Sequence, residues 1–358
     1  MGESTPNLRQ ASEPPKNPRP IVVIGTGGIV QDAHLPTYAK LGFFVAGVFD
    51  VNRDTATKAA RAFGIHTVYA SLGAALAEPG VIFDLAVPAT AVLGIVEQLP
   101  PASAVLIQKP LGSTLEDAKA IVLACQRRQL TAAVNLQLRF SPNMLALKDA
   151  LDRGLLGDVT DLEVRVNVHT PWHLWEFLKG LARHELLYHS IHYLDLIRYL
   201  VGEPQAVVCR ALKHPLLPDY GDTRSTILLD YGPNLRASLV MNHSHEFGDR
   251  HAASMFKLEG TRGAAVARMG VNLDYPQGKP DTLEIAQRGE REWTCVPLRG
   301  SWFIEAFEGP MSNLQRVVSG EDEKLVSSVT DTLKTMALIE ACYLSQEVPL
   351  TPVPELPD

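Results

Sequence analysis

Two residues far apart in the chain, Lys109 and His192, have side chains that can move a proton beside a reacting C–H bond. Lys109 follows the apolar run AVLIQ and precedes Pro110, whose ring restricts the backbone. Its ammonium could donate to a substrate hydroxyl, and loss of water there would lower its pKa. The imidazole of His192 titrates near neutrality and could remove a hydroxyl proton. Taken alone, Lys109 could equally be a solvated loop lysine, and His192 a histidine bonded within the core.

His192 is expected on a helix, ELLYHSIHYLDLIRYLVG. Its buried side would be formed by Leu187, Ile191, Leu194 and Ile197. Tyr188, His192 and Asp195 are four and three residues apart, so they share a neighbouring face. His184, His189 and His192 could suggest a metal site, but no carboxylate or cysteine completes a recognisable ligand set. We therefore predict that the site holds no metal.

A glycine cluster in IVVIGTGGIV joins a short apolar strand to a helix. Glycine at Gly25 and Gly27 would let a pyrophosphate approach the amide groups at the helix N-terminus. Asp50 ends the next strand, where an acid accepts hydrogen bonds from an adenosine ribose. Strand, glycines, helix, strand and acid in this order predict a dinucleotide site. One departure from the fingerprint is Val30, which stands where a third glycine or an alanine is usual.

The acid at Asp50 favours NAD, because the 2′-phosphate of NADP would lie against a carboxylate. Arg53 keeps NADP open, since an arginine at this place could pair with that phosphate. The residues expected to contact the cofactor are Gly25, Gly27, Gly28, Ile29, Asp50, Arg53, Pro88 and Lys109.

The elements that must position these residues follow from hydrophobic patterning. Apolar strands without polar alternation are separated by amphipathic helices, which indicates an α/β parallel sheet covered on both faces. The expected strands are 21–24, 43–50, 81–88, 104–110 and 131–136, and the expected helices cover 53–64, 90–99 and 113–129. Beyond Asn135 the alternation stops. Strand candidates joined by short turns then predict a large, mostly antiparallel sheet over 161–170, 205–213, 224–231, 235–243, 254–260 and 263–269.

Length and composition limit the remaining possibilities. A chain of 358 residues favours two domains. With 33 basic against 40 acidic residues, neither a nucleic-acid partner nor an anionic membrane surface is expected. The four cysteines are far apart and form no CxxC pair, and no signal-peptide or membrane-spanning pattern is present, so we expect reduced thiols in a cytoplasmic protein. The predicted division is a flexible arm (1–19), a Rossmann domain (20–134), a substrate and oligomerisation domain (135–345) and a tail (346–358).

With these motifs in place, the chain resembles the Gfo/Idh/MocA family, named for glucose–fructose oxidoreductase and inositol dehydrogenase. The family's glycine turn followed by His and Pro matches GTGGIVQDAHLP, and its Glu-Lys-Pro appears as Gln108-Lys109-Pro110. Its second-domain helix motif, Asp-x-Gly-x-His-x-x-Asp, appears as YHSIHYLD, and DTLKTMALIEACYLS is similar to its closing helix. The order and spacing of these motifs extend over nearly the whole chain beyond its N-terminal arm.

The resemblance implies a Rossmann domain followed by a domain with a large open, mostly antiparallel sheet, and a homodimer or homotetramer formed through that sheet. It also implies that Lys109 and His192 are catalytic. Tyr188 occupies the place of an aspartate that often helps to bind substrate, which leaves the substrate open. Gln108 in place of glutamate is a milder change that removes one charge beside Lys109.

Further residues are candidates for contact with the substrate. Tryptophan faces can stack on sugar rings, so the aromatic loop HTPWHLWEFLKGLARHE could form a wall or lid, or be ordinary packing. Arg139 and Asn135 occupy family positions near the substrate, although Arg139 could instead be a structural ion-paired residue. The expected substrate-binding residues are Tyr188, Arg139, Asn135, His189, Trp172 and Trp175.

The resulting prediction is an NAD(P)-dependent oxidoreductase that transfers hydride between nicotinamide and a hydroxyl-bearing carbon of a sugar, inositol or related polyol. Two alternatives stay open at this point. The first is imine reduction, or transient oxidation that assists an elimination or a glycoside cleavage, which Tyr188 leaves possible. The second is a cofactor-dependent sugar sensor without catalysis, against which the presence of both Lys109 and His192 argues.

Overall fold

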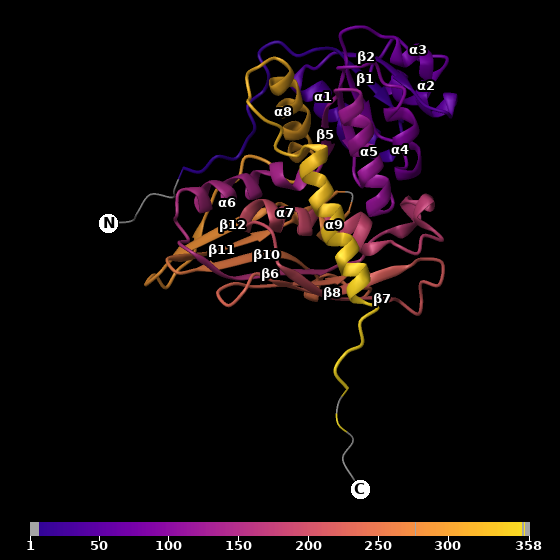
Figure 1. The fold of residues 1–358 in the computed structure, drawn as a ribbon. Coiled ribbons are helices and arrows are strands. Elements are labelled where there is room, and N and C mark those ends of the chain that lie inside the picture. Colours follow the sequence, from indigo (N-terminus) through magenta and orange to yellow (C-terminus); the bar gives the residue numbers. More distant parts are fainter. Residues whose placement is uncertain (1–6, 276, 353, 355–358) are drawn as a thin grey trace.

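Five parallel strands form the first sheet of the structure, a computed structural model that describes residues 7–275, 277–352 and 354. The strands are β1 (Ile21–Ile24), β2 (Val45–Phe49), β3 (Ile82–Leu85), β4 (Ala104–Gln108) and β5 (Thr131–Asn135). Their order is β2-β1-β3-β4-β5 (Figure 1). Because the strand order reverses at β1, the carboxyl ends of β1 and β3 flank the point where such sheets bind ligands.

Helices cover both faces of this sheet, so its strands are apolar on both sides. Residues Ile21 and Val23 of β1 pack into one hydrophobic cluster, and Val22 and Ile24 pack into another. The surrounding helices are α1 (Leu35–Leu41), α2 (Arg53–Ala62), α3 (Leu72–Leu76), α4 (Ala89–Val96) and α5 (Leu115–Arg127). The start of α5 is fixed by a capping box between Thr114 and Asp117. The predicted doubly wound parallel sheet is confirmed, although the sequence patterning did not predict α3.

The second sheet has eight strands in the order β13-β12-β11-β10-β6-β9-β8-β7. All neighbouring pairs are antiparallel except β6 with β9, which is parallel. The strands are β6 (Val159–Asn167), β7 (Ala206–Lys213), β8 (Asp222–Asp230), β9 (Arg236–Asn242), β10 (Ala253–Gly260), β11 (Gly263–Arg268), β12 (Thr282–Gln287) and β13 (Thr294–Cys295). The mostly antiparallel sheet is therefore confirmed, and β12 and β13 extend it beyond the predicted strands.

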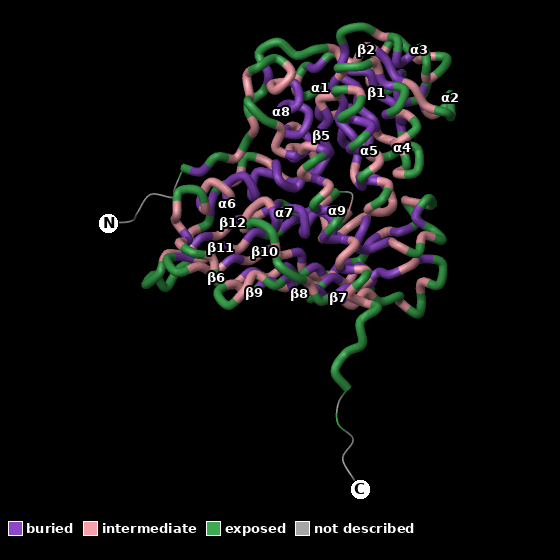
Figure 2. The backbone as a smooth tube through the Cα atoms, viewed as in Figure 1, coloured by how far each residue is buried: buried purple, intermediate pink, exposed green. Residues whose placement is uncertain are grey.

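Three helices lie between the two sheets and cover one face of the second sheet: α6 (Pro142–Asp152), α7 (Ile191–Val201) and α9 (Val329–Ser345) (Figure 1). Buried residues concentrate in this middle layer and in the first sheet (Figure 2). Eight short helical segments complete the fold: η1 (Val30–His34), η2 (Gln137–Phe140), η3 (Trp172–Leu174), η4 (Glu176–Leu178), η5 (Leu186–Ser190), η6 (Asp249–His251), η7 (Gly270–Leu273) and η8 (Glu305–Phe307). The opposite face of the second sheet carries no helix in the described part of the chain.

The predicted division at 134/135 misses a return of the chain to the first domain. Helix α8 (Glu308–Val318) packs on β4 and β5, and its Met311 and Leu314 belong to the same hydrophobic cluster as Ile21 and Val23. The segment 135–345 is therefore not one continuous second domain. The apolar side of α8 is buried by covering the sheet face that α1 and α2 leave open.

Residues 7–19 of the predicted N-terminal arm lie along the surface and contact other parts of the chain. Leu8 is buried in the main hydrophobic cluster. The Gln10 side chain donates to Pro297 O at 2.9 Å and accepts from the Arg299 N–H at 2.9 Å. The arm thus attaches to the loop that follows β13. Residues 1–6 of the predicted arm lie outside the described residues.

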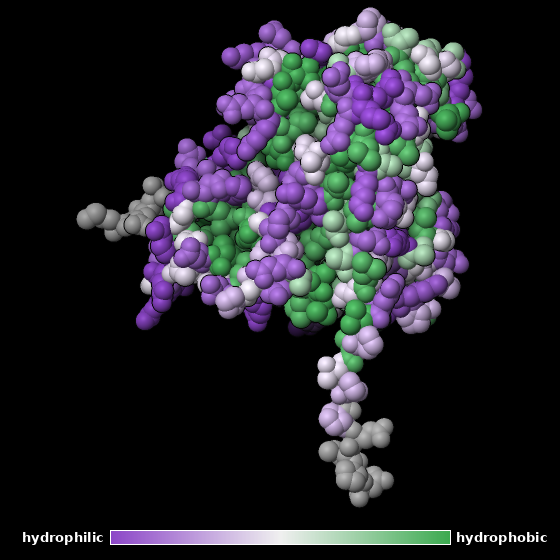
Figure 3. Space-filling model, viewed as in Figure 1, coloured by the Kyte–Doolittle hydropathy of each residue, from purple (hydrophilic) through white to green (hydrophobic). Residues whose placement is uncertain are grey.

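Polar and apolar residues occupy different parts of the face shown in Figure 3. Hydrophilic residues cover much of the first domain on the face shown in Figure 3, and hydrophobic residues gather where Figure 1 labels β11 and β12. Within the described residues, no helix combines the length and apolar character that a membrane crossing requires.

The attachment of the arm is tested by Leu8→Ala. Removing a buried leucine side chain that packs in the main cluster should lower the free energy of unfolding by about 2 kcal/mol. The matched control is Leu350→Ala near the C-terminus, where the leucine is exposed and the change should stay within about 0.5 kcal/mol. Urea unfolding curves of both variants measure the difference, and equal stabilities would show that the arm is loose.

Candidate functional site

The glycine turn between β1 and η1 has the shape of a phosphate cradle. Gly25 has φ +90°, and a Cβ atom there would lie 2.2 Å from Ala86 O, so only glycine fits. A Cβ on Gly27 would meet no atom within 4 Å, so this glycine faces open space. The Gly27 carbonyl accepts from the Val30 and Gln31 N–H groups, which starts the following helix. Gly28 is exposed beside it, Ile29 is half-buried, and both lie within reach of a group bound at this turn.

Asp50 follows β2 directly, and its carboxylate is oriented toward the glycine turn. Oδ2 accepts from the Thr26 N–H at 2.7 Å and from Thr26 Oγ1 at 3.1 Å, while Oδ1 accepts from the Asn52 N–H at 2.8 Å. The carboxylate keeps further acceptor capacity and part of its surface exposed, so it could also hold a ribose hydroxyl. Arg53 is exposed at the start of α2, and Pro88 is exposed at the N-terminus of α4. Open glycine backbone and an oriented acid fit a dinucleotide.

His34 connects the carboxyl ends of three strands behind this turn. Its Nδ1 lies 2.8 Å from Asp84 Oδ2 of β3, and Asn135 Nδ2 of β5 lies 3.1 Å from its Nε2. Because the amide of Asn135 can only donate through nitrogen, Nε2 is the acceptor and Nδ1 carries the proton that Asp84 accepts. Gln108 Nε2 of β4 lies 3.4 Å from the same Nε2, and Gln108 Oε1 accepts from the Lys109 N–H at 2.9 Å. The network therefore fixes the backbone just before the side chain of Lys109.

The side chain of Asn135, which is predicted to contact the substrate, takes part in this network. The Asn135 side chain is buried and donates to His34. Its Nδ2 thereby joins the end of β5 to His34, while its Oδ1 is buried without a partner.

Lys109 leaves the end of β4 and reaches the second domain. Its Nζ donates to Tyr188 O at 2.8 Å and lies 5.9 Å from the centre of the Tyr188 ring. Burial of the ammonium lowers the pKa of Lys109 to about 8, because the charged form loses water. The lysine side chain keeps part of its surface exposed, so two of its three N–H groups stay available for a substrate oxygen.

His192 lies in the first turn of α7, buried on the side that faces Trp302. The two ring centres are 5.6 Å apart in an edge-on arrangement. Its Nδ1 is buried and has no hydrogen-bond partner. Burial lowers the pKa of His192 well below its ordinary value, and the positive charge of Lys109 lowers it further. The imidazole is therefore neutral at pH 7 and able to accept a proton.

Three other predicted residues lie on the same side of the second domain as His192. Tyr188 and His189 are half-buried in η5, and burial raises the pKa of Tyr188. Trp175 is half-buried, with its ring centre 5.1 Å from that of Tyr275. Trp172, predicted as an exposed wall, is only 5% exposed and packs among Leu178 and Tyr220. Its faces are covered by side chains, so the packing alternative holds for Trp172.

The prediction that Arg139 binds substrate is wrong, and the structural ion-paired alternative holds. Its guanidinium is 2% exposed. Nε and Nη2 donate to the two oxygens of Asp195 at 2.6 Å, Nη2 also donates to Asp331 Oδ2 at 2.6 Å, and Nη1 donates to Val326 O at 2.7 Å. Arg198 donates to the same Asp331 at 3.2 Å. This pairing occupies Arg139 and attaches α7 to the start of α9.

Sequence patterning missed several residues that the fold brings to the site. Trp302, 110 positions beyond His192, lies edge-on against the imidazole of His192, and its backbone N–H donates to Asp281 Oδ2 at 2.6 Å. His184 and His243 pack around Trp172 and His189. His184 is considered from the sequence only as a possible metal ligand, whereas Trp302 and His243 come from loops with no recognisable pattern.

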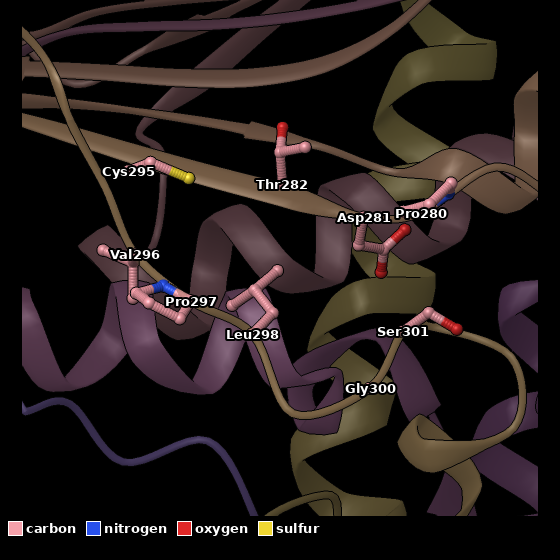
Figure 4. Close-up of a pocket in the computed structure, with 9 residues that line it drawn as sticks. All are labelled: Pro280, Asp281, Thr282, Cys295, Val296, Pro297, Leu298, Gly300 and Ser301. Atoms are coloured by element: carbon pink, nitrogen blue, oxygen red, sulfur yellow. The ribbon is translucent and has the colours of Figure 1, made fainter.

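A pocket of about 380 Å³ lies at the edge of the second sheet (Figure 4). It is lined by the turn around Asp281 and by the loop from Cys295 to Ser301. Both carboxylate oxygens of Asp281 accept backbone N–H groups, those of Gly270 and Trp302. The pocket therefore adjoins Asp281, which accepts the backbone N–H of Trp302. None of the predicted catalytic residues is among its lining residues. Among the described residues, no three His, Cys, Asp or Glu side chains are arranged to hold a metal ion.

Two family models match successive parts of this chain. Residues 19–136 match the model of an oxidoreductase family with an NAD-binding Rossmann fold, and residues 144–266 match the GFO/IDH/MocA C-terminal domain. D-apiose dehydrogenase of Paraburkholderia graminis is 28% identical over 339 residues, which cover 90% of this chain and 86% of that protein. Inositol 2-dehydrogenase/D-chiro-inositol 3-dehydrogenase of Lacticaseibacillus casei is 28% identical over 51% of this chain and 52% of its own.

Solved structures share the fold at lower sequence identity. An oxidoreductase from Agrobacterium radiobacter, in complex with NAD⁺, L-tartaric acid and magnesium, superposes with a TM-score of 0.79 at 20% identity. The match covers 92% of this chain and 97% of that one. Aldose-aldose oxidoreductase from Caulobacter crescentus, complexed with glycerol, gives a TM-score of 0.77 at 17% identity over 92% and 98% of the two chains. With both family models matched in order and the glycine turn, Lys109 and His192 placed as described, the chain belongs to the Gfo/Idh/MocA family of oxidoreductases.

Proposed function

We propose that this protein is an NAD(P)-dependent dehydrogenase that acts on a hydroxyl-bearing carbon of a sugar, inositol or related polyol. The observation that carries the proposal is the pairing of Lys109 with His192. Lys109 comes from the first domain and His192 from the second. Burial lowers the pKa of both groups, and the positive charge of Lys109 lowers the pKa of His192 further. Groups with shifted pKa values beside a cofactor-type turn are typical of acid–base catalysis.

The chain's own residues divide the work of alcohol oxidation between proton removal and orientation. A nicotinamide dinucleotide bound along the glycine turn would supply the acceptor for the hydride that leaves the substrate carbon. The buried Nδ1 of His192 leaves Nε2 to accept the hydroxyl proton. Lys109 donates hydrogen bonds from Nζ to the reacting oxygen and stabilises the negative charge that develops on it. Tyr188, through its carbonyl, holds that ammonium in place.

We propose NAD as the preferred cofactor. The carboxylate of Asp50 is already oriented by Thr26 and Asn52, so it presents a fixed negative charge where a 2′-phosphate would lie. Arg53 is exposed at the start of α2. The NAD⁺-bound structural neighbour supports a dinucleotide at this turn, and the choice of NAD rests on Asp50.

The relatives support a carbohydrate-type substrate. The names of D-apiose dehydrogenase, levoglucosan dehydrogenase and inositol 2-dehydrogenase each describe oxidation of a sugar, an anhydrosugar or a cyclic polyol. In this chain, half-buried Tyr188, His189 and Trp175 offer hydroxyl, imidazole and aromatic surfaces on one side of the second domain, which suit such a molecule. The four cysteines are unpaired, which supports a reducing, cytoplasmic setting.

We also propose that the open face of the second sheet forms a homodimer or homotetramer interface. On this face Val208, Leu228 and Val240 are 52, 49 and 47% exposed on the adjacent strands β7, β8 and β9. Charges of both signs border them, including the pair of Arg236 with Asp161 at 2.6 Å. An exposed apolar patch with a polar rim is typical of a protein–protein contact.

The catalytic assignment predicts that Lys109→Met and His192→Ala abolish turnover while the cofactor still binds. Each loss should lower kcat by about 10²–10⁴-fold, because each variant removes a proton-transferring or orienting group. Absorbance of reduced nicotinamide is followed with NAD or NADP and a panel of aldoses, inositols, sugar acids and their keto forms, in both directions.

Exposed residues provide the controls for this experiment. Lys119→Met and His66→Ala change the same residue types on the surface of the first domain and should keep normal turnover. Disappearance of substrate without net change in reduced cofactor would instead indicate transient oxidation on the same scaffold. Full activity of Lys109→Met would exclude the proposed catalytic role.

Asp50→Asn should shift the cofactor preference. Removing the fixed negative charge should raise the KM for NAD and lower that for NADP, together changing the NAD/NADP ratio of kcat/KM by about 10-fold or more. Asp54→Asn, an exposed acid in the first turn of α2, is the matched control and should leave the ratio unchanged. An unchanged ratio in Asp50→Asn would show that this carboxylate does not select the cofactor.

The interface proposal predicts that Val240→Lys separates the oligomer. A charge placed at the centre of a buried apolar contact would be desolvated without a partner, so association should weaken by at least about 100-fold. Light scattering after size exclusion measures the mass of the particle. Leu123→Lys, at an equally exposed leucine on α5, should leave the mass unchanged. A wild-type protein that is monomeric at micromolar concentration would contradict the proposal.

A further inference from the structure

Five aromatic and imidazole side chains form a compact group behind Tyr188, which we name the histidine cluster. Its members are Trp172, His184, His189, Tyr220 and His243. The ring centres of His189 and His243 are 4.5 Å apart, those of Trp172 and His184 are 4.6 Å apart, and those of Trp172 and His189 are 5.0 Å apart. His189 is the half-buried member of this group on the same helical run as His192, and the others lie buried around it, with Tyr220 and Trp172 at the base.

The cluster holds an unusual concentration of buried polar atoms that have no partner. These atoms are Trp172 Nε1, His184 Nδ1, His184 Nε2, His189 Nδ1 and His243 Nε2. Buried polar atoms in folded proteins are almost always hydrogen-bonded, so a group of unpaired ones indicates that a hydrogen-bonding molecule belongs beside them. Nδ1 of His243, by contrast, lies within hydrogen-bonding distance of Thr170 Oγ1 at 3.0 Å. This nitrogen therefore has a protein partner.

The electrostatic surroundings of the cluster oppose a negative ligand. Burial lowers the pKa of His184 to about 4 and that of His189 well below its ordinary value, so both imidazoles are neutral at pH 7. The carboxylates of Glu185 and Asp222 lie buried beside them, with one oxygen of each lacking a partner. Glu185 Oε1 is 3.6 Å from His243 Nε2, and Asp222 Oδ1 accepts from the His184 N–H at 3.0 Å.

The cations around this part of the fold are already engaged. Arg183 pairs with Glu340 at 2.6 Å, Arg198 with Glu203 at 2.7 Å, and Arg139 with Asp195. Lys109 is a lysine whose charge acts on His189, and its Nζ is bonded to Tyr188 O and assigned to the reacting oxygen. An acidic or phosphorylated substrate would therefore find no second positive group here to balance its charge.

A hydroxyl group matches what the cluster offers. A neutral imidazole presents one donor and one acceptor, and a hydroxyl can serve both, whereas a carboxylate only accepts and an ammonium only donates. We propose that the protein selects an uncharged polyol over sugar acids and sugar phosphates, and that His189, held in place by His243 and Trp172, is the specificity-determining residue. The inference rests on the proposed function for the reaction, but it concerns binding and is measurable without turnover.

The test uses the wild-type protein saturated with NADH, so that ligand binding is read in a complex that does not react with alcohols. Calorimetry compares uncharged aldopentoses, aldohexoses and inositols with the corresponding uronates, aldonates and sugar phosphates. The best uncharged ligand should bind at least about 100-fold more tightly than its charged counterpart, because a desolvated, uncompensated charge is strongly disfavoured. Tightest binding by an acid or a phosphate, or no binding by any uncharged member, would overturn the proposal.

Variants at position 189 separate recognition from folding. His189→Leu should weaken the best uncharged ligand by at least about 10-fold, because the donor and acceptor are both lost. His189→Asn keeps a donor and an acceptor and should restore binding to within about 3-fold. His251→Leu, an exposed histidine of η6, is the matched control with unchanged binding. Wild-type binding by His189→Leu would refute the assignment.

The same experiments distinguish this inference from the proposed function. With oxidised cofactor, loss of His189 should raise KM much more than it lowers kcat, whereas loss of His192 should lower kcat. Selective binding of an uncharged polyol without any turnover would leave the inference standing and reject the dehydrogenase. Turnover with a preference for sugar acids would support the proposed dehydrogenase and reject the inference.

Discussion

The buried bond between His34 and Asp84 is the interaction on which the first half of the site depends. It fixes the tautomer of His34, which lets Nε2 accept from Asn135 and leaves Gln108 close by. Tyr38 donates to the same Asp84 oxygen at 2.8 Å. The ends of β3, β4 and β5 are thereby joined behind Lys109, so the lysine leaves a rigid strand end rather than a mobile loop. Removing one partner would leave several buried polar groups unsatisfied, each at a cost of about 1–3 kcal/mol.

A second polar network performs the corresponding task in the other domain. Asp195, one turn after His192 on α7, receives two bonds from Arg139 and one from Thr335 Oγ1 of α9 at 2.7 Å. Because Asp195 is buried, its charge requires these partners, and loss of one of them would destabilise the fold by about 3–5 kcal/mol. The orientation of α7, and with it the imidazole of His192, is therefore set by charge pairing as well as by apolar packing.

Local patterns in the sequence predicted the parts of the site that are built from neighbouring residues. The glycine turn and the acid at Asp50 lie within one strand–helix–strand unit, so their spacing alone indicated their proximity. The partners of Asn135 and Arg139 could not be predicted because they are remote: His34 is 101 positions away, and Asp331 is 192 positions away. The same limit explains Trp302 and the return of α8 to the first sheet. Which remote residues come into contact depends on the topology of the fold, and the hydrophobic periodicity of the sequence does not specify that topology.

The division of the proposed catalytic residues, Lys109 and His192, between two domains has a consequence for their chemistry. Lys109 leaves the first sheet and His192 belongs to α7, so their electrostatic coupling depends on the distance between the domains. The bond from Lys109 Nζ to Tyr188 O brings the ammonium to the helix that carries His192. If the domains separated, water would reach both groups, the pKa of each would return toward its ordinary value, and the lysine would lose its orientation. The desolvation of both groups therefore depends on the contact between the two domains that this bond makes.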